Sequence, residues 1–455
     1  MHATVSPDTA PEPAQLPVHQ LEGQQHYLRA LTDMAGHCQV LAQKALYNDR
    51  GVKLLEQGAR VDSSLYDRLI QHKLSEPIDE QLSVQGMVSV ESVRQQAQEQ
   101  CRQDPLLQRL LAMPQGPGES LLLAPVRALV LPHTLALRLT VLREQHPVRY
   151  QHSLRVMLVC LYLACKSGLR ERDLPALAAA ALLHDIGVLH LDPVWHDPGQ
   201  RISGAGRKAL MVHPITAAVV IQAQKAYPAS VSQAVLEHHE RMDGSGYPRG
   251  LTGERISPMG QILLLAEVAT AFFEKYAHQS AALRLSLMLR MGHRKFPAAL
   301  VAWLLPVLSP GSEVGDMQAT PTQVQELIDL LSHSFADWDR RCIALAPEAF
   351  APQGGMACAF VTQGLIALQK TLFEAGSHPQ QQAEALAYLE GDPEGLAELL
   401  LLGREALWQL QSLIDGLQSR WPRLQTSADP ADQAAAQWGE DFSARIAAMA
   451  QMPAA

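Results

Sequence analysis

The stretch LPALAAAALLHDIG, residues 174–187, decides the fold of this 455-residue chain. It is a run of apolar, helix-forming residues that ends in His184 and Asp185. A helix this apolar is expected to be buried, and a buried imidazole or carboxylate without a partner costs several kcal/mol. The sequence therefore predicts a buried helix whose end carries a ligand-binding pair.

Other side chains that bind metals recur at wide intervals on both sides of this pair. They are His152, His213, His238, His239 and Glu267. Imidazole and carboxylate groups suit transition ions, and helices can supply single ligands from distant parts of a chain. The whole set exceeds the four ligands of one tetrahedral ion. We therefore expect two divalent transition-metal ions, either iron, manganese, nickel or zinc.

Two ions about 3.5–4 Å apart can clamp a phosphate and generate a bridging hydroxide. Such a centre hydrolyses a phosphoester without a nucleophile from the protein. Each motif alone has a simpler explanation: a histidine–aspartate pair at the surface, a helix start at His213, or a solvated loop at His238 and His239. Their combination beside apolar helices favours the metal centre.

Four segments resemble the HD-GYP family, a subset of the HD-domain phosphohydrolases. They are HSLRV (152–156), LLHDIG (182–187), HPITAAVVI (213–221) and HHERMDGSGYPRGLTGERI (238–256). The last segment contains almost the full signature of the family, with Gly246, Tyr247 and Pro248 as its GYP. The resemblance covers about 145–305.

The resemblance implies a helical domain with a two- or three-metal centre that hydrolyses cyclic di-GMP, a bacterial second messenger, to pGpG or GMP. It also implies that His184 and Asp185 are catalytic and that Asp185 bridges two metals. The metal ligands that it implies are His152, His184, Asp185, His213, His238 and His239, with Glu267 at the position of the family's metal-binding aspartate. No glutamate lies just upstream of His152, which favours two metals over three.

The chain departs from the family pattern at several positions of the site. Val188 replaces a lysine that lies beside the phosphate, Gln261 replaces an arginine expected to contact the substrate, and Thr270 replaces a second aspartate. Each lost charged contact costs about 1.5–3 kcal/mol. These departures leave open an alternative function, in which a partly degenerate HD-GYP module acts as a cyclic di-GMP sensor or a protein-interaction scaffold.

The GYP loop supplies the predicted substrate contacts. Arg241 and Arg249 are expected to meet the phosphate or the guanine, while Tyr247 and Pro248 are expected to shape the loop. Gly246 permits a close approach of the backbone. An alternative for both arginines is a solvated charge on the loop.

Composition sets the remaining expectations. The formal net charge of -9 gives no overall attraction for a nucleic-acid polymer or an anionic membrane. The six cysteines are scattered and are expected to be reduced thiols. The longest apolar runs, such as AALVAWLLPVL (298–308), are shorter than the ~20 residues of a membrane span. We therefore expect a cytoplasmic protein whose partner is a cyclic dinucleotide.

The chain is expected to be mainly α, with four regions. Residues 1–19 are proline-rich and predict a disordered tail. Residues 20–140 predict a mixed α/β regulatory region, in which 26–47 has helical periodicity. Residues 141–305 predict the HD-GYP-like domain, and 306–455 predict a helical C-terminal region. Helices of the N- or C-terminal region could form a homodimer or bind a protein partner.

Overall fold

The computed structural model describes residues 24–62, 65–72, 74–114, 116–196, 205–276, 281–308, 319–345, 357–374, 378–389 and 391–450. The predicted tail at 1–19 lies outside them. The described chain is mainly helical with two small antiparallel sheets, which confirms the predicted fold class. None of the described helices combines the length and the hydropathy that a membrane span requires.

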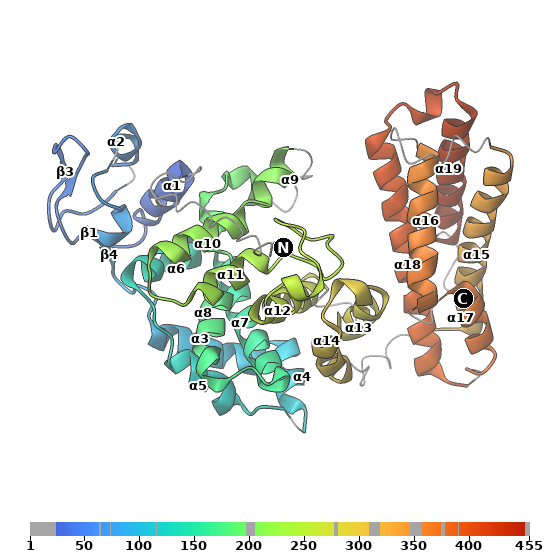
Figure 1. The fold of residues 1–455 in the computed structure, drawn as a ribbon, viewed down its shortest axis with the longest axis horizontal. Coiled ribbons are helices and arrows are strands. Elements are labelled where there is room, and N and C mark those ends of the chain that lie inside the picture. Colours follow the sequence, from blue (N-terminus) through green and yellow to red (C-terminus); the bar gives the residue numbers. More distant parts are fainter. Residues whose placement is uncertain are drawn as a thin grey trace, which may run out of the picture. The chain divides into compact units, whose positions relative to one another are not determined.

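The chain forms two units, each with its own contacts (Figure 1). The first unit comprises residues 1–275 and 294–307, and the second comprises 276–293 and 308–455. The boundaries predicted at 140/141 and 305/306 remain predictions.

The first unit begins with a small mixed segment. Helix α1 (Gln24–Met34) is followed by β1 (Val40–Ala42), β2 (Leu46–Tyr47), β3 (Lys53–Leu55), α2 (Leu65–Gln71), the 3-10 turn η2 (Ile78–Glu80) and β4 (Leu82–Val84). Strand β1 pairs with β4, and β2 pairs with β3. The predicted helical periodicity over 26–47 was wrong beyond Met34, because Val40 and Leu46 bury their side chains in strands instead.

Helices make up the rest of the first unit. They are α3 (Val90–Gln103), α4 (Pro105–Ala112), α5 (Glu119–Arg127), α6 (His133–Gln145), α7 (Pro147–Ser167), α8 (Leu174–Leu183), α9 (Ala205–Leu210), α10 (His213–Ala223), α11 (Ala229–Glu237), α12 (Pro258–Lys275) and α14 (Ala298–Leu304). Helix α8 contacts α7, α11, α5 and α12. These neighbours bury α8 on nearly all sides, which explains why its sequence has no polar face.

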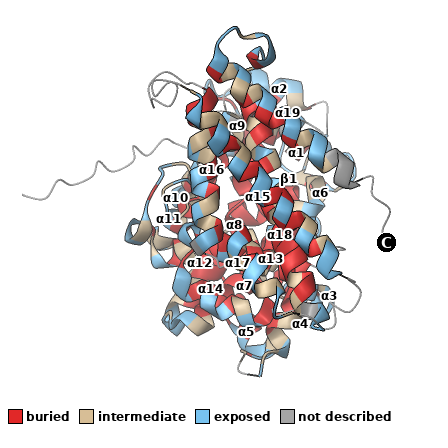
Figure 2. Cartoon of the chain, turned by 90° about the vertical axis from the view of Figure 1, so that its right-hand side faces the viewer, coloured by how far each residue is buried: buried red, intermediate tan, exposed pale blue. Residues whose placement is uncertain are grey.

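The described residues of the second unit form helices and connecting turns, without strands. It contains α13 (Ala281–Met291), α15 (Pro321–Ile343), α16 (Ala357–Glu374), α17 (Pro379–Leu386), α18 (Pro393–Arg420) and α19 (Pro430–Ala450). Helix α15 packs against α18, and α16 packs against both α18 and α19. Buried residues, red in Figure 2, follow α15 and α18, and the core includes Leu331, Leu410, Ile414 and Trp438.

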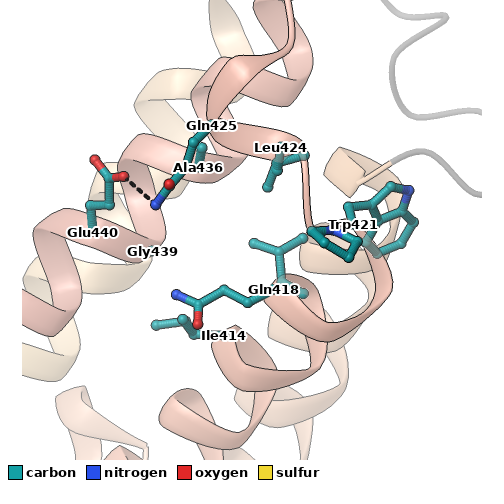
Figure 3. A pocket seen from close by; sticks show the side chains of 10 residues that line it. Ile414, Gln418, Trp421, Leu424, Gln425, Ala436, Gly439 and Glu440 are labelled. Carbon is teal, nitrogen blue, oxygen red and sulfur yellow. Dashed lines mark hydrogen bonds between the residues drawn. The ribbon is translucent and has the colours of Figure 1, made fainter.

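A cleft of about 250 Å³ opens between the end of α18, the turn η11 (Leu424–Thr426) and α19 (Figure 3). Ile414 and Leu417 line it with apolar side chains, while Gln418, Trp421 and Gln425 supply polar groups. The Gln425 amide donates a hydrogen bond of 2.8 Å to Glu440. The cleft belongs to the second unit and contains none of the predicted site residues.

Candidate metal centre

His184 and Asp185 lie where the buried helix α8 ends. His184 is the C-terminal cap of α8, and Asp185 precedes the turn η4 (Ile186–His190). His184 is fully buried, and the Asp185 side chain is 8% exposed. The packing of α8 against its neighbours thus places both groups inside the first unit, as the sequence predicted.

Three of the other histidines lie at helix ends near this point, whereas His152 lies within α7. His213 is the first residue of α10, and His238 caps the end of α11, directly before His239. Turn η4 packs against α10. A Cβ atom at Gly187 would lie only 2.1 Å from the carbonyl oxygen of His213, so this close approach requires glycine.

The predicted ligands come together in two groups. His152, His184 and Asp185 offer ligand atoms within 4.8 Å of one another, and so do His213, His238 and His239. Asp185 links the groups, because its Oδ1 lies 3.3 Å from Nε2 of His213 and 3.7 Å from Nε2 of His184.

Glu267, on α12, joins the first of these groups. Its Oε2 lies 2.8 Å from Nε2 of His152 and 3.3 Å from Nε2 of His184. The longer glutamate side chain therefore still reaches the position at which the family pattern has an aspartate. Thr270, one turn further along α12, is buried, and its hydroxyl has no hydrogen-bond partner among the described residues.

The protein backbone fixes the orientation of three of the imidazole rings. Nδ1 of His184 lies 2.7 Å from the carbonyl of Ala181, Nδ1 of His213 lies 2.6 Å from that of Leu210, and Nδ1 of His238 lies 2.5 Å from that of Val235. Each carbonyl is at the C-terminal end of a helix, where carbonyls lack a partner within the helix. A carbonyl can only accept, so each Nδ1 carries a hydrogen, and each Nε2 presents a lone pair when its ring is neutral.

These lone pairs face one another in a buried space. Nε2 of His213 lies 3.2 Å from Nε2 of His238, and Nε2 of His184 lies 3.3 Å from Oε2 of Glu267 without good hydrogen-bond geometry. Two lone pairs at this distance repel each other, and a buried unpartnered nitrogen is costly. A transition-metal cation between them would remove both penalties, so the residues present fit such an ion.

The acid–base properties of three of the histidines agree with this fit. Burial lowers the pKa of His238 far below its usual range and that of His239 to about 3, and neighbouring imidazoles add to both effects. Burial also lowers the pKa of His213. Neutral imidazole is the form that binds metals.

Carboxylates have the opposite effect on the other two rings. Burial opposes the charged form of His152, but Glu267 and Glu274 raise its pKa well above the usual value. Asp185 and Glu267 likewise raise the pKa of His184 against the effect of burial. This end of the cluster therefore favours positive charge.

Sequence reasoning missed the groups that hold His152. Oε2 of Glu274 lies 2.9 Å from its Nδ1, and Arg155 binds Oε1 of the same carboxylate at 2.7 Å. Arg155 also contacts Asp104 at 3.2 Å. Such outer contacts set the orientation and basicity of a metal ligand. Glu274 follows Glu267 by two helical turns, and this spacing was the available signal.

The GYP loop lies against the second group of histidines. The Tyr247 ring stacks on the ring of His239, with centroids 4.7 Å apart and an angle of 24° between planes. The Tyr247–Pro248 peptide is cis. A Cβ atom at Gly246 would lie 2.4 Å from the backbone nitrogen of Arg241, so the predicted close approach is present.

Two buried carboxylates that the sequence reasoning missed hold this loop. Glu240 accepts hydrogen bonds from the N–H groups of Arg249 at 2.8 Å and Leu251 at 2.9 Å. Glu237 accepts from the Arg249 guanidinium and from the Ser257 N–H, both at 2.9 Å. Both glutamates are fully buried. The sequence signal for Glu237 and Glu240 was their position next to His238 and His239, at the end of an apolar helix.

The two arginines predicted to contact substrate are bound to protein groups. Arg249 pairs with Glu237, and the Arg241 guanidinium donates to the carbonyl of Glu240 at 2.8 Å and lies over the Phe296 ring. Substrate contacts by Arg241, Arg249, Gly246, Tyr247 and Pro248 remain predictions.

Comparison with known proteins finds similarity over this part of the chain. Residues 137–292 match the family described as HD domain. The 3'3'-cGAMP-specific phosphodiesterase 1 of Vibrio cholerae is 35% identical over 123 residues, which are 27% of this chain and 28% of that protein. A cyclic di-GMP phosphodiesterase of Pseudomonas aeruginosa is 32% identical over 148 residues, 32% of this chain and 36% of that protein.

Among solved structures, an HDG"Y"P protein from Bdellovibrio bacteriovorus is 18% identical, with a TM-score of 0.34 over 59% of this chain and 95% of that one. The similar segment spans only about a third of the length of each of the two curated relatives.

Proposed function

We propose that this chain, whose residues 137–292 match the HD domain family, is a metal-dependent phosphodiesterase of the HD-GYP kind that hydrolyses cyclic di-GMP to pGpG or GMP. The observation that carries the proposal is the convergence of imidazole lone pairs and carboxylates in one buried cluster. The names of the relatives support a cyclic dinucleotide as the substrate. A cytoplasmic location and a homodimer or protein partner remain predictions.

Two divalent transition ions, when bound, would make water nucleophilic at neutral pH and offset the charge of the phosphate. His152, His184 and Glu267 would hold one ion, and His213, His238 and His239 the other, with Asp185 between them. Burial keeps the second set of imidazoles neutral and ready to bind. Glu237 and Glu240 hold the loop that would cover the substrate.

The proposal is tested by loading the purified chain with manganese or iron and offering cyclic di-GMP and 3'3'-cGAMP separately. We expect pGpG or GMP from cyclic di-GMP, and about two ions per chain by elemental analysis. His184→Ala should abolish the product, because it removes a buried ligand, whereas His333→Ala, on the exposed face of α15, should change nothing.

A second candidate is the partly degenerate module that senses or binds without turnover. Val188 and Gln261 have uncharged side chains, so neither supplies a positive charge to a phosphate. Val188 is buried in the core, and the Gln261 amide donates to the carbonyl of Ile256 at 3.0 Å. Binding of cyclic di-GMP without any product, with every metal, would favour this candidate over the phosphodiesterase.

A further inference from the structure

Arg149 is a cation beside the cluster that the sequence reasoning did not consider. It lies on α7, one turn before His152, and its Nη1 is 3.4 Å from Oδ2 of Asp185. The other oxygen of this carboxylate, Oδ1, faces the histidines at 3.3 Å from Nε2 of His213. The Asp185 carboxylate therefore lies between the Arg149 guanidinium and the predicted ion positions.

The Arg149 side of the Asp185 carboxylate is more open to solvent than the His184 side. His184 is 0% exposed, the Asp185 side chain 8% and the Arg149 side chain 36%. An anion that approaches from this side meets the Arg149 guanidinium before it reaches the metal ligands.

The hydrogen bonding of Arg149 leaves it able to bind a further anion. Its contact with Asp185 is at the long end of the hydrogen-bond range and uses one of five N–H donors. By contrast, Arg249 is paired with buried Glu237, and Arg241 donates to a backbone carbonyl. A guanidinium matches two oxygens of a phosphate better than a lysine ammonium does.

We propose that Arg149 binds a non-bridging oxygen of the phosphodiester at the metal centre and supplies the positive charge that Val188 and Gln261 do not. The proposal rests on the proposed function and adds a residue for phosphate binding to it. Asp185 would keep its Oδ1 towards the ions, while Arg149 remains beside Oδ2 and directs its other donors to the phosphate. A positive charge that the protein holds in place next to a reacting phosphate stabilises the transition state more than the same charge would in water.

The test uses the full chain loaded with manganese and a phosphodiester without a guanine base, bis(p-nitrophenyl) phosphate, beside cyclic di-GMP. Arg149→Gln should lower kcat/KM for both by about 10- to 100-fold, the loss of one charged contact. The binding of inorganic phosphate, measured by calorimetry, should weaken by a similar factor. Manganese per chain should stay unchanged, and Arg149→Lys should give intermediate values. Arg170→Gln, at an exposed arginine paired with Asp173, is the matched control and should behave as wild type.

The outcomes separate this proposal from the proposed function. If the manganese-loaded wild type neither cleaves the diesters nor binds phosphate, the proposed function fails and this proposal fails with it. An active wild type with an equally active Arg149→Gln variant overturns this proposal alone. Loss of manganese in Arg149→Gln would also overturn it, since Arg149 would then act only by positioning Asp185.

Discussion

His190 illustrates how single residues link the candidate site to the N-terminal segment. Its Nε2 lies 2.9 Å from Nη1 of Arg138, and Nη2 of Arg138 binds Asp79 at 2.5 Å. Tyr27 donates to Asp79, and its ring lies under the Arg138 guanidinium and stacks with His190. These buried groups come from α1, η2, α6 and η4, and η4 directly follows Asp185.

The charge state of His190 predicts a dependence of stability on pH. Burial, followed by the charges of Arg138 and His26, lowers its pKa far below the ordinary value. Asp79 and Tyr27 also belong to this cluster. The unfolded chain binds a proton below about pH 6.5 that the folded chain does not, so stability is lost as pH falls through that value.

The variant His190→Gln keeps an acceptor for Arg138 but cannot titrate. Between pH 7.5 and 5.5, wild type should lose roughly 1.4 kcal/mol more unfolding free energy than the variant. Urea denaturation of both proteins at both pH values measures the difference, because most other titrating groups contribute equally to each. An identical pH dependence would contradict the low pKa of His190.

At the residue scale, the sequence predicted the groups that cluster but not what holds them. Buried imidazoles and carboxylates could be recognised from apolar neighbours, as at His184. For Glu274 the only signal was its spacing from Glu267, and for Arg149 there was none, because Arg149 is an ordinary helix-face charge until α7 packs beside the end of α8. Whether the seven predicted ligands bind ions stays a prediction.

At the element scale, the GYP loop depends on the helix that precedes it. Glu237 and Glu240 lie at the end of α11 and accept backbone N–H groups from the far side of the loop. The loop therefore keeps its shape through two carboxylates, although it has little regular secondary structure.

Glu240→Gln should loosen this loop, because an amide offers one accepting oxygen where the carboxylate offers two. We expect a local loss of about 1.5–3 kcal/mol, as for a hydrogen bond to a buried charge. Hydrogen exchange should quicken in residues 243–257 and leave α3 unchanged. Glu254→Gln, on the exposed side of the same loop, is the control. Equal exchange in the two variants would show that Glu240 does not hold the loop.

Local patterns predicted the helices well and the short strands poorly. The continuous apolar run of α8 and the amphipathic pattern of α15 are typical of helices. Strands β1 and β2 are too short to show an alternation of apolar and polar residues. Their pairing partners decide their conformation, and β1 pairs with residues 82–84, about forty positions later. Such pairing is not visible in a single stretch of sequence.

At the scale of the whole molecule, the buried hydrophobic residues of the chain belong to two units with separate cores. The second unit has its own core around Leu410 and Ile414, formed by α13 and the helices from α15 to α19. Composition and periodicity predicted a helical C-terminal region but gave no reason to assign α13 to it. The resemblance to the HD-GYP family is confirmed by the relatives and the family match, over about a third of the chain.

Ile414→Ala tests the independence of the second core. Ile414 is fully buried, so the variant should lose about 2–5 kcal/mol of stability in this unit. The metal content and the metal-dependent activity should equal those of wild type, while the thermal transition of the second unit moves to lower temperature. A parallel loss of bound metal would mean that the two cores do not act separately.

The bonds from three imidazole Nδ1 atoms to the ends of helices have a consequence for how the protein acquires its metal. Contacts within the folded polypeptide itself orient these rings. We therefore expect maturation to consist of two events, with folding first and metal loading second. Which element would be inserted then depends on the ligands and geometry of the site and on the cellular supply of each metal.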